Sequence, residues 1–285
     1  MKTLKTIVAA AAVALLATAC GTANKPSTLP AYAPQYPAQE QNGKIAVVAH
    51  RGFWNCDAAG KSENSIASLR EAQKNGFWGS EFDVQLTSDD VLIVNHDNNI
   101  DGKRIWDNPY SAFAAHRLPN GEKVSTLDEY LTQGEKSKKT MLILEFKEQL
   151  NEERENLMVD KTFAMLKAHN LYDPNRVAFI SFSLNVCKKV AAEAPEFVNQ
   201  YLNGDIAPGD LKDMKINGMD YAKKVIFAHP DYVELCKYHG MSSNAWTVNS
   251  EEEIQKMIDL GVNAITTNEP LLVRKMVGKN REFKK

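Results

Sequence analysis

The sequence is poor in cysteine, with 4 in 285 residues, which excludes a small fold held together by many disulfides. Three of them, Cys56, Cys187 and Cys236, lie beyond residue 43 with a spacing that matches no zinc site. An odd number of thiols cannot all pair, so we expect no disulfide framework, with a single bridge left open. Neither charge dominates, because 34 basic and 36 acidic side chains give a net charge of −2. Without a basic excess, we expect no nucleic-acid partner.

The apolar run near the N-terminus is too short to cross a bilayer. It spans residues 7–19, 13 in all, whereas a membrane-spanning helix needs about 20. Two lysines precede the run and Cys20 follows it, a pattern that resembles the signal of a bacterial lipoprotein. Ala17 stands where such signals usually have leucine, so a plain secretory signal with an incidental cysteine is the alternative.

From this pattern we predict a signal peptide over residues 1–19 and a lipid on the thiol of Cys20 that anchors the chain to a membrane. The predicted location is the bacterial cell envelope, facing the periplasm or the outer membrane. Residues 20–43 contain four of the eleven prolines and no apolar period, which predicts an extended linker. The remaining residues, 44–285, are expected to form one globular domain, since the chain is 44% hydrophobic and 25% charged.

Short β-branched runs alternate with amphipathic helical patterns through this domain. Such alternation favours an α/β fold with a parallel sheet, and eight strands with helices between them predict a TIM-type (β/α)8 barrel. Helices are expected at 185–194 and at 250–260, where Ser250 can cap the first turn. The eight predicted strands are 45–49, 79–84, 141–146, 177–182, 197–202, 219–222, 241–247 and 263–267.

One segment breaks the alternation, because the apolar run at 91–97 follows the second strand too closely for a parallel crossover. We therefore predict an antiparallel hairpin over residues 84–95. A turn centred between Asp89 and Asp90 would place Asp83 opposite His96. The irregular residues 98–125 are then expected to form an insertion at the same barrel mouth, as a lid or a wall for a substrate.

Polar side chains stand at the ends of the first three predicted strands, where the active site of a barrel usually lies. Carboxylates two residues apart on a strand share one side of it. Three carboxylates that converge would repel one another unless a cation neutralised them, and oxygen ligands suit Ca²⁺ or Mg²⁺. The residues are His50 and Arg51 after the first strand, Glu81 and Asp83 on the second, and Glu145 and Lys147 on the third. We expect one divalent cation, Ca²⁺ or Mg²⁺, as cofactor.

Six segments together resemble the glycerophosphodiester phosphodiesterase family, over residues 44–275. They read VVAHRG, ENS, SEFDVQLTSDDVLIVNHD, LEFK, AWTVNS and GVNAITTNEP. The resemblance implies a TIM-type barrel that hydrolyses glycerophosphodiesters, with the help of a metal, to glycerol 3-phosphate and an alcohol. It also implies that His50 and His96 are the acid/base pair, and that Glu81, Asp83 and Glu145 are the metal ligands.

The same resemblance assigns the residues that would hold the substrate. Arg51 and Lys147 stand at the family's phosphate contacts, and Trp246 at the aromatic near the alcohol part of the substrate. Glu63, in the ENS segment, is implied to contact the metal or a residue that holds it. The alternative is that the ENS segment serves mainly as a helix start, with Asn64 or Ser65 as the cap.

The sequence also departs from the family pattern. Ser62 stands in place of a proline, and Ser65 in place of threonine. Asn268 replaces the aspartate of the final motif, which we expect to alter a contact behind the metal or acid/base residues. The loop at 53–61 is longer than the family leads us to expect, and it is expected to reshape the substrate pocket.

Three questions remain open on the sequence alone. The attacking group is either water or the 2-hydroxyl of the substrate's own glycerol. The substrate is either a soluble glycerophosphodiester or, as in phospholipase-type barrels, an intact lipid or an inositol phosphodiester. The third question is whether the protein is an enzyme at all, or a lipoprotein that binds a phosphodiester without cleaving it. The full set of acid/base and carboxylate residues disfavours the binding protein.

Overall fold

The computed structural model describes residues 45–282. The predicted signal peptide, Cys20, the predicted linker and the domain boundary at residue 44 lie outside the described residues. Within the described part, no helix combines the length and the apolar character needed to cross a membrane. The three cysteines of this part, Cys56, Cys187 and Cys236, are free thiols.

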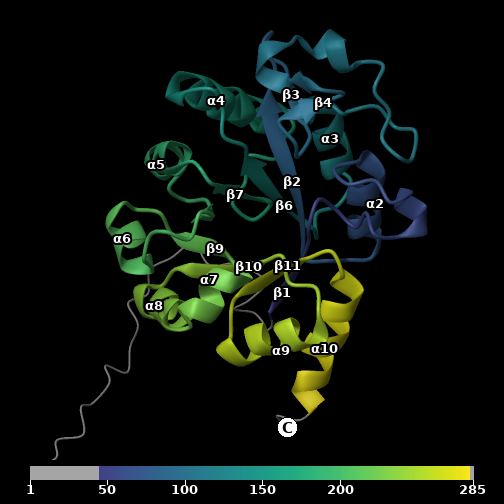
Figure 1. Cartoon of the computed structure of the whole chain (residues 1–285). Helices are drawn as coiled ribbons and strands as arrows, with labels where there is room; N and C mark the ends of the chain where they lie inside the picture. The colour runs from purple at the N-terminus through teal and green to yellow at the C-terminus, as the bar shows by residue number, and fades with distance from the viewer. Residues whose placement is uncertain (1–44, 283–285) are drawn as a thin grey trace, which may run out of the picture.

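Eight parallel strands form a closed barrel (Figure 1), because β1 pairs with β11 on one side and with β2 on the other. All eight strands lie where the sequence predicts them, and the predicted (β/α)8 barrel is confirmed. Their apolar runs are continuous because parallel strands are covered on both faces. The strands are β1 (Ala46–Ala49), β2 (Gly79–Leu86), β6 (Met141–Phe146), β7 (Val177–Ser181), β8 (Asn199–Tyr201), β9 (Gly218–Ala222), β10 (Ser242–Trp246) and β11 (Ala264–Thr267).

Helices lie around the outside of the barrel (Figure 1). Ser250 caps α9 and forms a capping box with Glu253, as the sequence predicts. The helices are α2 (Ile66–Lys74), α3 (Leu127–Gly134), α4 (Glu152–Ala168), α5 (Leu184–Glu193), α6 (Pro208–Asp213), α7 (Lys223–Ala228), α8 (Asp231–His239), α9 (Glu251–Leu260) and α10 (Pro270–Glu282).

The apolar core has an inner and an outer zone, because successive side chains of a strand point to opposite faces. Val48, Ile143 and Ile180 are buried in one cluster, and Leu144 is buried in another with side chains of α3, α4 and α5. Ile143 and Glu145 have the same parity on β6. Glu145 therefore points to the inside of the barrel, at the end where the strand finishes.

The predicted hairpin is present, but its predicted register is wrong by one residue. β3 (Leu92–Val94) pairs antiparallel with β2, with Val84 opposite Val94. Asp83 therefore lies opposite Asn95 and accepts a hydrogen bond from its backbone N–H (3.1 Å), rather than facing His96. The cause is the turn, which is centred on Asp89 because Asp90 adopts a left-handed conformation with φ of 61°.

The predicted insertion at 98–125 is an ordered layer over the hairpin. It contains the two-stranded β4 (Asn99–Ile100) and β5 (Lys103–Arg104) and two short 3-10 helices. Four of its side chains form a small buried cluster with Ile93 of β3, and they are Ile100, Ile105, Phe113 and Val124. This local core fixes the insertion beside the barrel mouth.

Candidate active site

The turn after β1 sets the position of two polar side chains. Arg51 has a φ of 55° and Gly52 a φ of 80°, both in the left-handed region. A Cβ at Gly52 would lie 2.3 Å from Ser68 Oγ, so glycine is required there. In this conformation the backbone N–H of Arg51 donates to Glu81 Oε2 (2.7 Å). Backbone strain of this kind is typical of functional sites.

Three carboxylates meet at the mouth of the barrel. Glu81 and Asp83 come from β2 and Glu145 from β6, where Asp83 and Glu145 are direct neighbours in register. One carboxylate oxygen from each lies within 4.8 Å of the other two, and all three side chains are buried. Glu81 Oε1 is buried and finds no hydrogen-bond donor among the described residues. An acceptor-only oxygen cluster with a buried orphan atom fits a hard divalent cation.

The electrostatics of this triad also favour a bound cation. Burial, followed by the charges of Asp83 and Glu145, raises the pKa of Glu81 well above its usual value. Burial, followed by the charge of Asp83, raises the pKa of Glu145 to about 7. Burial alone would also raise the pKa of Asp83, but Lys147, His96 and a hydrogen bond from Asn64 lower it. A bound cation would relieve the repulsion among the three groups.

Two cations lie beside the triad. Lys147 Nζ is 2.8 Å from Glu145 Oε1 and 3.4 Å from Asp83 Oδ1. Arg51 Nε lies 3.9 Å from Asp83 Oδ2, and its Nη1 donates to Glu63 Oε2 (2.5 Å). Both side chains are largely buried, with 13% and 19% exposed, so their charges act in a medium of low polarity.

The three residues of the ENS segment, Glu63, Asn64 and Ser65, have different roles in the structure. Glu63 lies outside the acidic triad and pairs with Arg51 instead. Asn64 Nδ2 donates to Asp83 Oδ2 (2.8 Å), so this amide orients a triad member rather than capping the helix. Ser65 caps α2, because its Oγ accepts from the backbone N–H of Ser68 (2.9 Å). Helix start and support of the site are thus both present in this segment.

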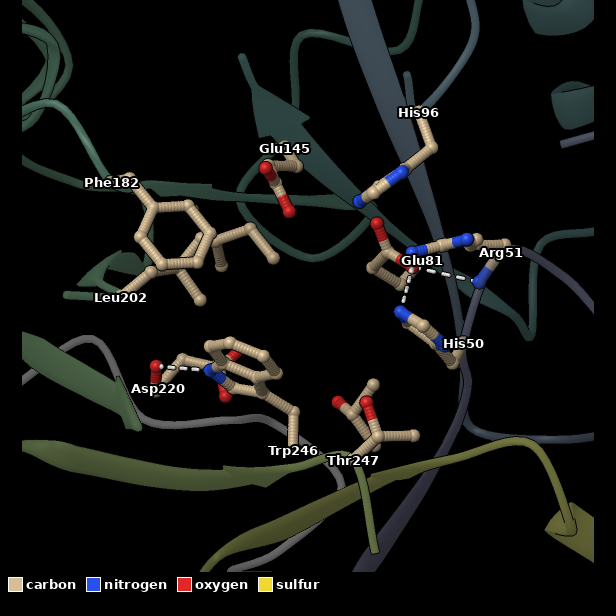
Figure 2. Close-up of a pocket in the computed structure, with 12 residues that line it drawn as sticks. His50, Arg51, Glu81, His96, Glu145, Phe182, Leu202, Asp220, Trp246 and Thr247 are labelled. Carbon is tan, nitrogen blue, oxygen red and sulfur yellow. Dashed lines mark hydrogen bonds and ion pairs between the residues drawn. The ribbon is translucent and has the colours of Figure 1, made fainter. Parts of the chain in front are cut away.

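Two imidazoles, His50 and His96, point towards Glu81 and Glu145 (Figure 2). His50 Nδ1 hydrogen-bonds Asn268 Oδ1 (2.8 Å), and its Nε2 lies 4.0 Å from Glu81 Oε2. Burial, followed by the charge of Arg51, lowers the pKa of His50 to about 4. His96 is more exposed, and its Nδ1 pairs with Asp97 Oδ1 (2.7 Å). In both rings Nδ1 is engaged, which leaves Nε2 for chemistry.

A cavity of about 150 Å³ joins these groups to an aromatic wall (Figure 2). Trp246 and Phe182 contact edge to face, with ring centroids 5.6 Å apart. The indole N–H of Trp246 donates to the backbone oxygen of Asp220 (2.9 Å), which holds the ring in place. His50, Arg51, Glu81, His96, Glu145 and Trp246 therefore line one cavity.

Asp220 also lines this cavity, and the sequence reading did not single it out. Its Oδ2 accepts from Asn244 (3.0 Å), whereas its Oδ1 is buried without a partner among the described residues. Burial, with the charge of Glu145, raises the pKa of Asp220 well above its usual value. The available signal was a lone carboxylate inside the otherwise uncharged strand GMDYA.

Residues 50–272 match the sequence profile of the Glycerophosphoryl diester phosphodiesterase family. A crystal structure of a glycerophosphodiester phosphodiesterase from Parabacteroides distasonis is 40% identical with a TM-score of 0.81, over 84% of this chain and 98% of that chain. The glycerophosphodiester phosphodiesterase of Caldanaerobacter subterraneus subsp. tengcongensis is 26% identical over 253 residues, 83% of this chain and 99% of that protein.

A phosphodiesterase from Oleispira antarctica, solved in complex with the product sn-glycerol-3-phosphate, is 21% identical with a TM-score of 0.69. The likeness covers 84% of this chain and 98% of that one, and at this identity it speaks for the fold alone. The profile match, by contrast, extends from His50 at the end of β1 into α10. It spans the whole cavity and well over half of the sequence, so the chain belongs to the glycerophosphoryl diester phosphodiesterase family.

Proposed function

We propose that this protein hydrolyses glycerophosphodiesters to glycerol 3-phosphate and an alcohol, with the help of one divalent cation. The observation that carries the proposal is the buried triad of Glu81, Asp83 and Glu145. Two of its members, Glu81 and Glu145, line one cavity together with the imidazoles of His50 and His96. The family match and the names of the similar proteins support the substrate class.

The triad would hold the cation, Ca²⁺ or Mg²⁺, since all three ligands are carboxylates. When bound, the cation would offset the negative charge of the phosphodiester and polarise its oxygens. Arg51 and Lys147 would bind non-bridging phosphate oxygens, which brings two further positive charges to the position where charge develops. Glu63 would keep the Arg51 guanidinium in place through its hydrogen bond.

The two histidines would divide the proton transfers. His50 is buried and uncharged near neutral pH, and Asn268 accepts from its Nδ1–H, so Nε2 is free to take a proton from the attacking hydroxyl. His96 pairs through Nδ1 with the Asp97 carboxylate, which orients the ring and leaves its Nε2 facing the cavity. Its Nε2–H would then protonate the leaving alkoxide. Trp246 would pack against the glycerol part of the substrate, and not against the alcohol part as the family resemblance implies.

From the sequence alone, we further propose that the protein works at the bacterial cell envelope. The supporting features are the signal pattern over residues 1–19, Cys20 and the proline-rich linker. These features would tether the barrel to a membrane that contains phospholipids, the source of glycerophosphodiesters after deacylation.

A substrate panel tests the proposed function. We expect release of glycerol 3-phosphate from soluble diesters such as glycerophosphocholine and glycerophosphoinositol, followed by phosphorus NMR. Intact phosphatidylcholine in micelles should react at least about 100-fold more slowly, because none of the exposed large apolar side chains of the described residues lines the cavity to receive two acyl chains. Faster turnover of the micellar lipid would favour a phospholipase instead. Binding of the diesters without any cleavage would favour a binding protein.

A further inference from the structure

A second cavity, of about 270 Å³, adjoins the first. Arg51 and His96 line both cavities, so the two share the groups proposed to contact the phosphate and the leaving oxygen. Trp54, Lys61 and Pro119 belong to the second cavity alone, and the mechanism above makes no use of them.

Three segments build this second cavity. They are the long loop after β1, residues 95–97 after the hairpin, and the end of the insertion, which contributes Leu118 and Pro119. Ser62 Oγ accepts from the backbone N–H of Asn120 (2.8 Å), and Asn120 Nδ2 donates to the backbone oxygen of Ala59 (3.3 Å). A Cβ at Gly60 would lie 2.6 Å from Asn120 Cβ, so the segments pack tightly. The cavity wall is therefore held in place by specific hydrogen bonds and close packing between the loop and the insertion.

A phosphodiester has two ester arms on one phosphorus atom. With the phosphate between Arg51, His96 and the triad, the glycerol arm can lie in the first cavity against Trp246. The second arm then has the adjoining cavity available, next to the imidazole that would protonate its oxygen. We propose that the second cavity is the subsite for the leaving alcohol and that it selects a neutral polyol, such as glycerol or inositol. This inference rests on the proposed function.

The lining of the second cavity suits hydroxyl groups. Lys61 supplies hydrogen-bond donors, and the carboxylates of Glu63 and Asp97 supply acceptors. The indole N–H of Trp54 is buried without a partner among the described residues, so it too calls for an acceptor. A hydroxyl both donates and accepts, which allows it to pair with either kind of group. Leu118 and Pro119 offer apolar contact to the carbon skeleton of a polyol.

A quaternary ammonium headgroup matches the same lining poorly. It has neither a donor nor an acceptor, so it would leave the polar groups of the cavity unpaired. The lining also offers an ammonium no net electrostatic attraction, because the positive charges of Lys61 and Arg51 are balanced by the carboxylates of Glu63 and Asp97. Trp54 alone could attract a cation by its ring face, but no cage of several aromatic rings surrounds it in the described lining.

Relative rates with different leaving alcohols test the proposal. In the wild-type protein, kcat/KM for glycerophosphoinositol should exceed that for glycerophosphocholine by at least about 10-fold. Lys61→Met removes a charge and a donor at nearly constant length. It should lower kcat/KM for glycerophosphoinositol about 10-fold and leave glycerophosphocholine unchanged or faster. Lys138→Met, an exposed lysine remote in sequence from the cavity, is the matched control and should change neither rate.

A substrate without a headgroup separates binding from structural damage. Trp54→Ala should lower kcat/KM for glycerophosphoinositol at least about 10-fold but change the methyl ester of glycerol 3-phosphate less than about 2-fold. Equal losses on both substrates, no loss on either, or a wild-type preference for the choline ester would each overturn the subsite. Failure of the wild-type protein to hydrolyse any diester would instead refute the proposed function, and the subsite with it.

Discussion

Replacement of Glu81 by glutamine should lower kcat for glycerophosphodiesters by about 10³-fold or more, while the barrel stays folded. Glu81 Oε1 is one of the buried triad oxygens without a hydrogen-bond donor among the described residues, so the amide removes one negative charge at the position proposed for the cation. The amide keeps the size of the side chain, and an amide oxygen can still accept from the Arg51 N–H. The measurement is glycerol 3-phosphate release at several concentrations of Ca²⁺ or Mg²⁺.

Thermal unfolding gives a second readout that needs no turnover. In the wild-type protein the cation should raise the melting temperature, because it binds the folded state only. Without the cation, Glu81→Gln should melt at the same temperature or higher, since it relieves repulsion between buried carboxylates. It should also lose most of the response to the cation. Glu252→Gln, at an exposed carboxylate on α9, is the control. Full activity in Glu81→Gln would remove this residue from the site.

Replacement of His96 by alanine should lower kcat for glycerophosphocholine by about 10²–10⁴-fold. The loss should be far smaller, about 10-fold or less, for the p-nitrophenyl ester of glycerol 3-phosphate, whose leaving group needs no proton. His50→Ala should slow both substrates alike, because a base is required with either leaving group. Steady-state rates of both variants on both substrates provide the comparison.

His239→Ala is the control for loss of an imidazole, since His239 lies at the end of α8, outside both cavities. Equal losses on both substrates in His96→Ala would contradict its role as the acid. The reverse pattern, with His50→Ala rescued by the better leaving group, would exchange the two roles.

Most of the fold follows from local sequence patterns. Each strand is a short apolar run, and helices such as α9 carry their own capping residues, so both are visible without knowledge of distant contacts. The register of the hairpin was predicted wrongly because it depends on the backbone angle of one residue, Asp90, which composition does not specify. A shift of one residue changes which side chains face each other.

The candidate site was predictable wherever its residues end an apolar strand. His50 follows β1 and Glu145 stands near the end of β6, and the structure brings both into one cavity. Asp220 does not stand out, because a single carboxylate in a short strand has no partner nearby in the sequence. The contact between His50 and Asn268 joins residues 218 positions apart, so only the closure of the barrel reveals it.

The second cavity is even less predictable from sequence patterns than the first. It depends on packing between the loop after β1 and Asn120 of the insertion, through hydrogen bonds that neither segment predicts alone. The pairing of Glu63 with Arg51 is a further contact that the ENS motif alone does not specify. Long-range packing therefore decides the details of specificity.

The most direct test is metal-dependent release of glycerol 3-phosphate from a soluble diester. The protein is treated with a chelator, and glycerophosphoinositol hydrolysis is measured before and after Ca²⁺ or Mg²⁺ is restored. We predict that the rate falls at least about 100-fold on chelation and recovers with one of the two cations. Undiminished hydrolysis in the stripped protein would contradict a cation held by Glu81, Asp83 and Glu145.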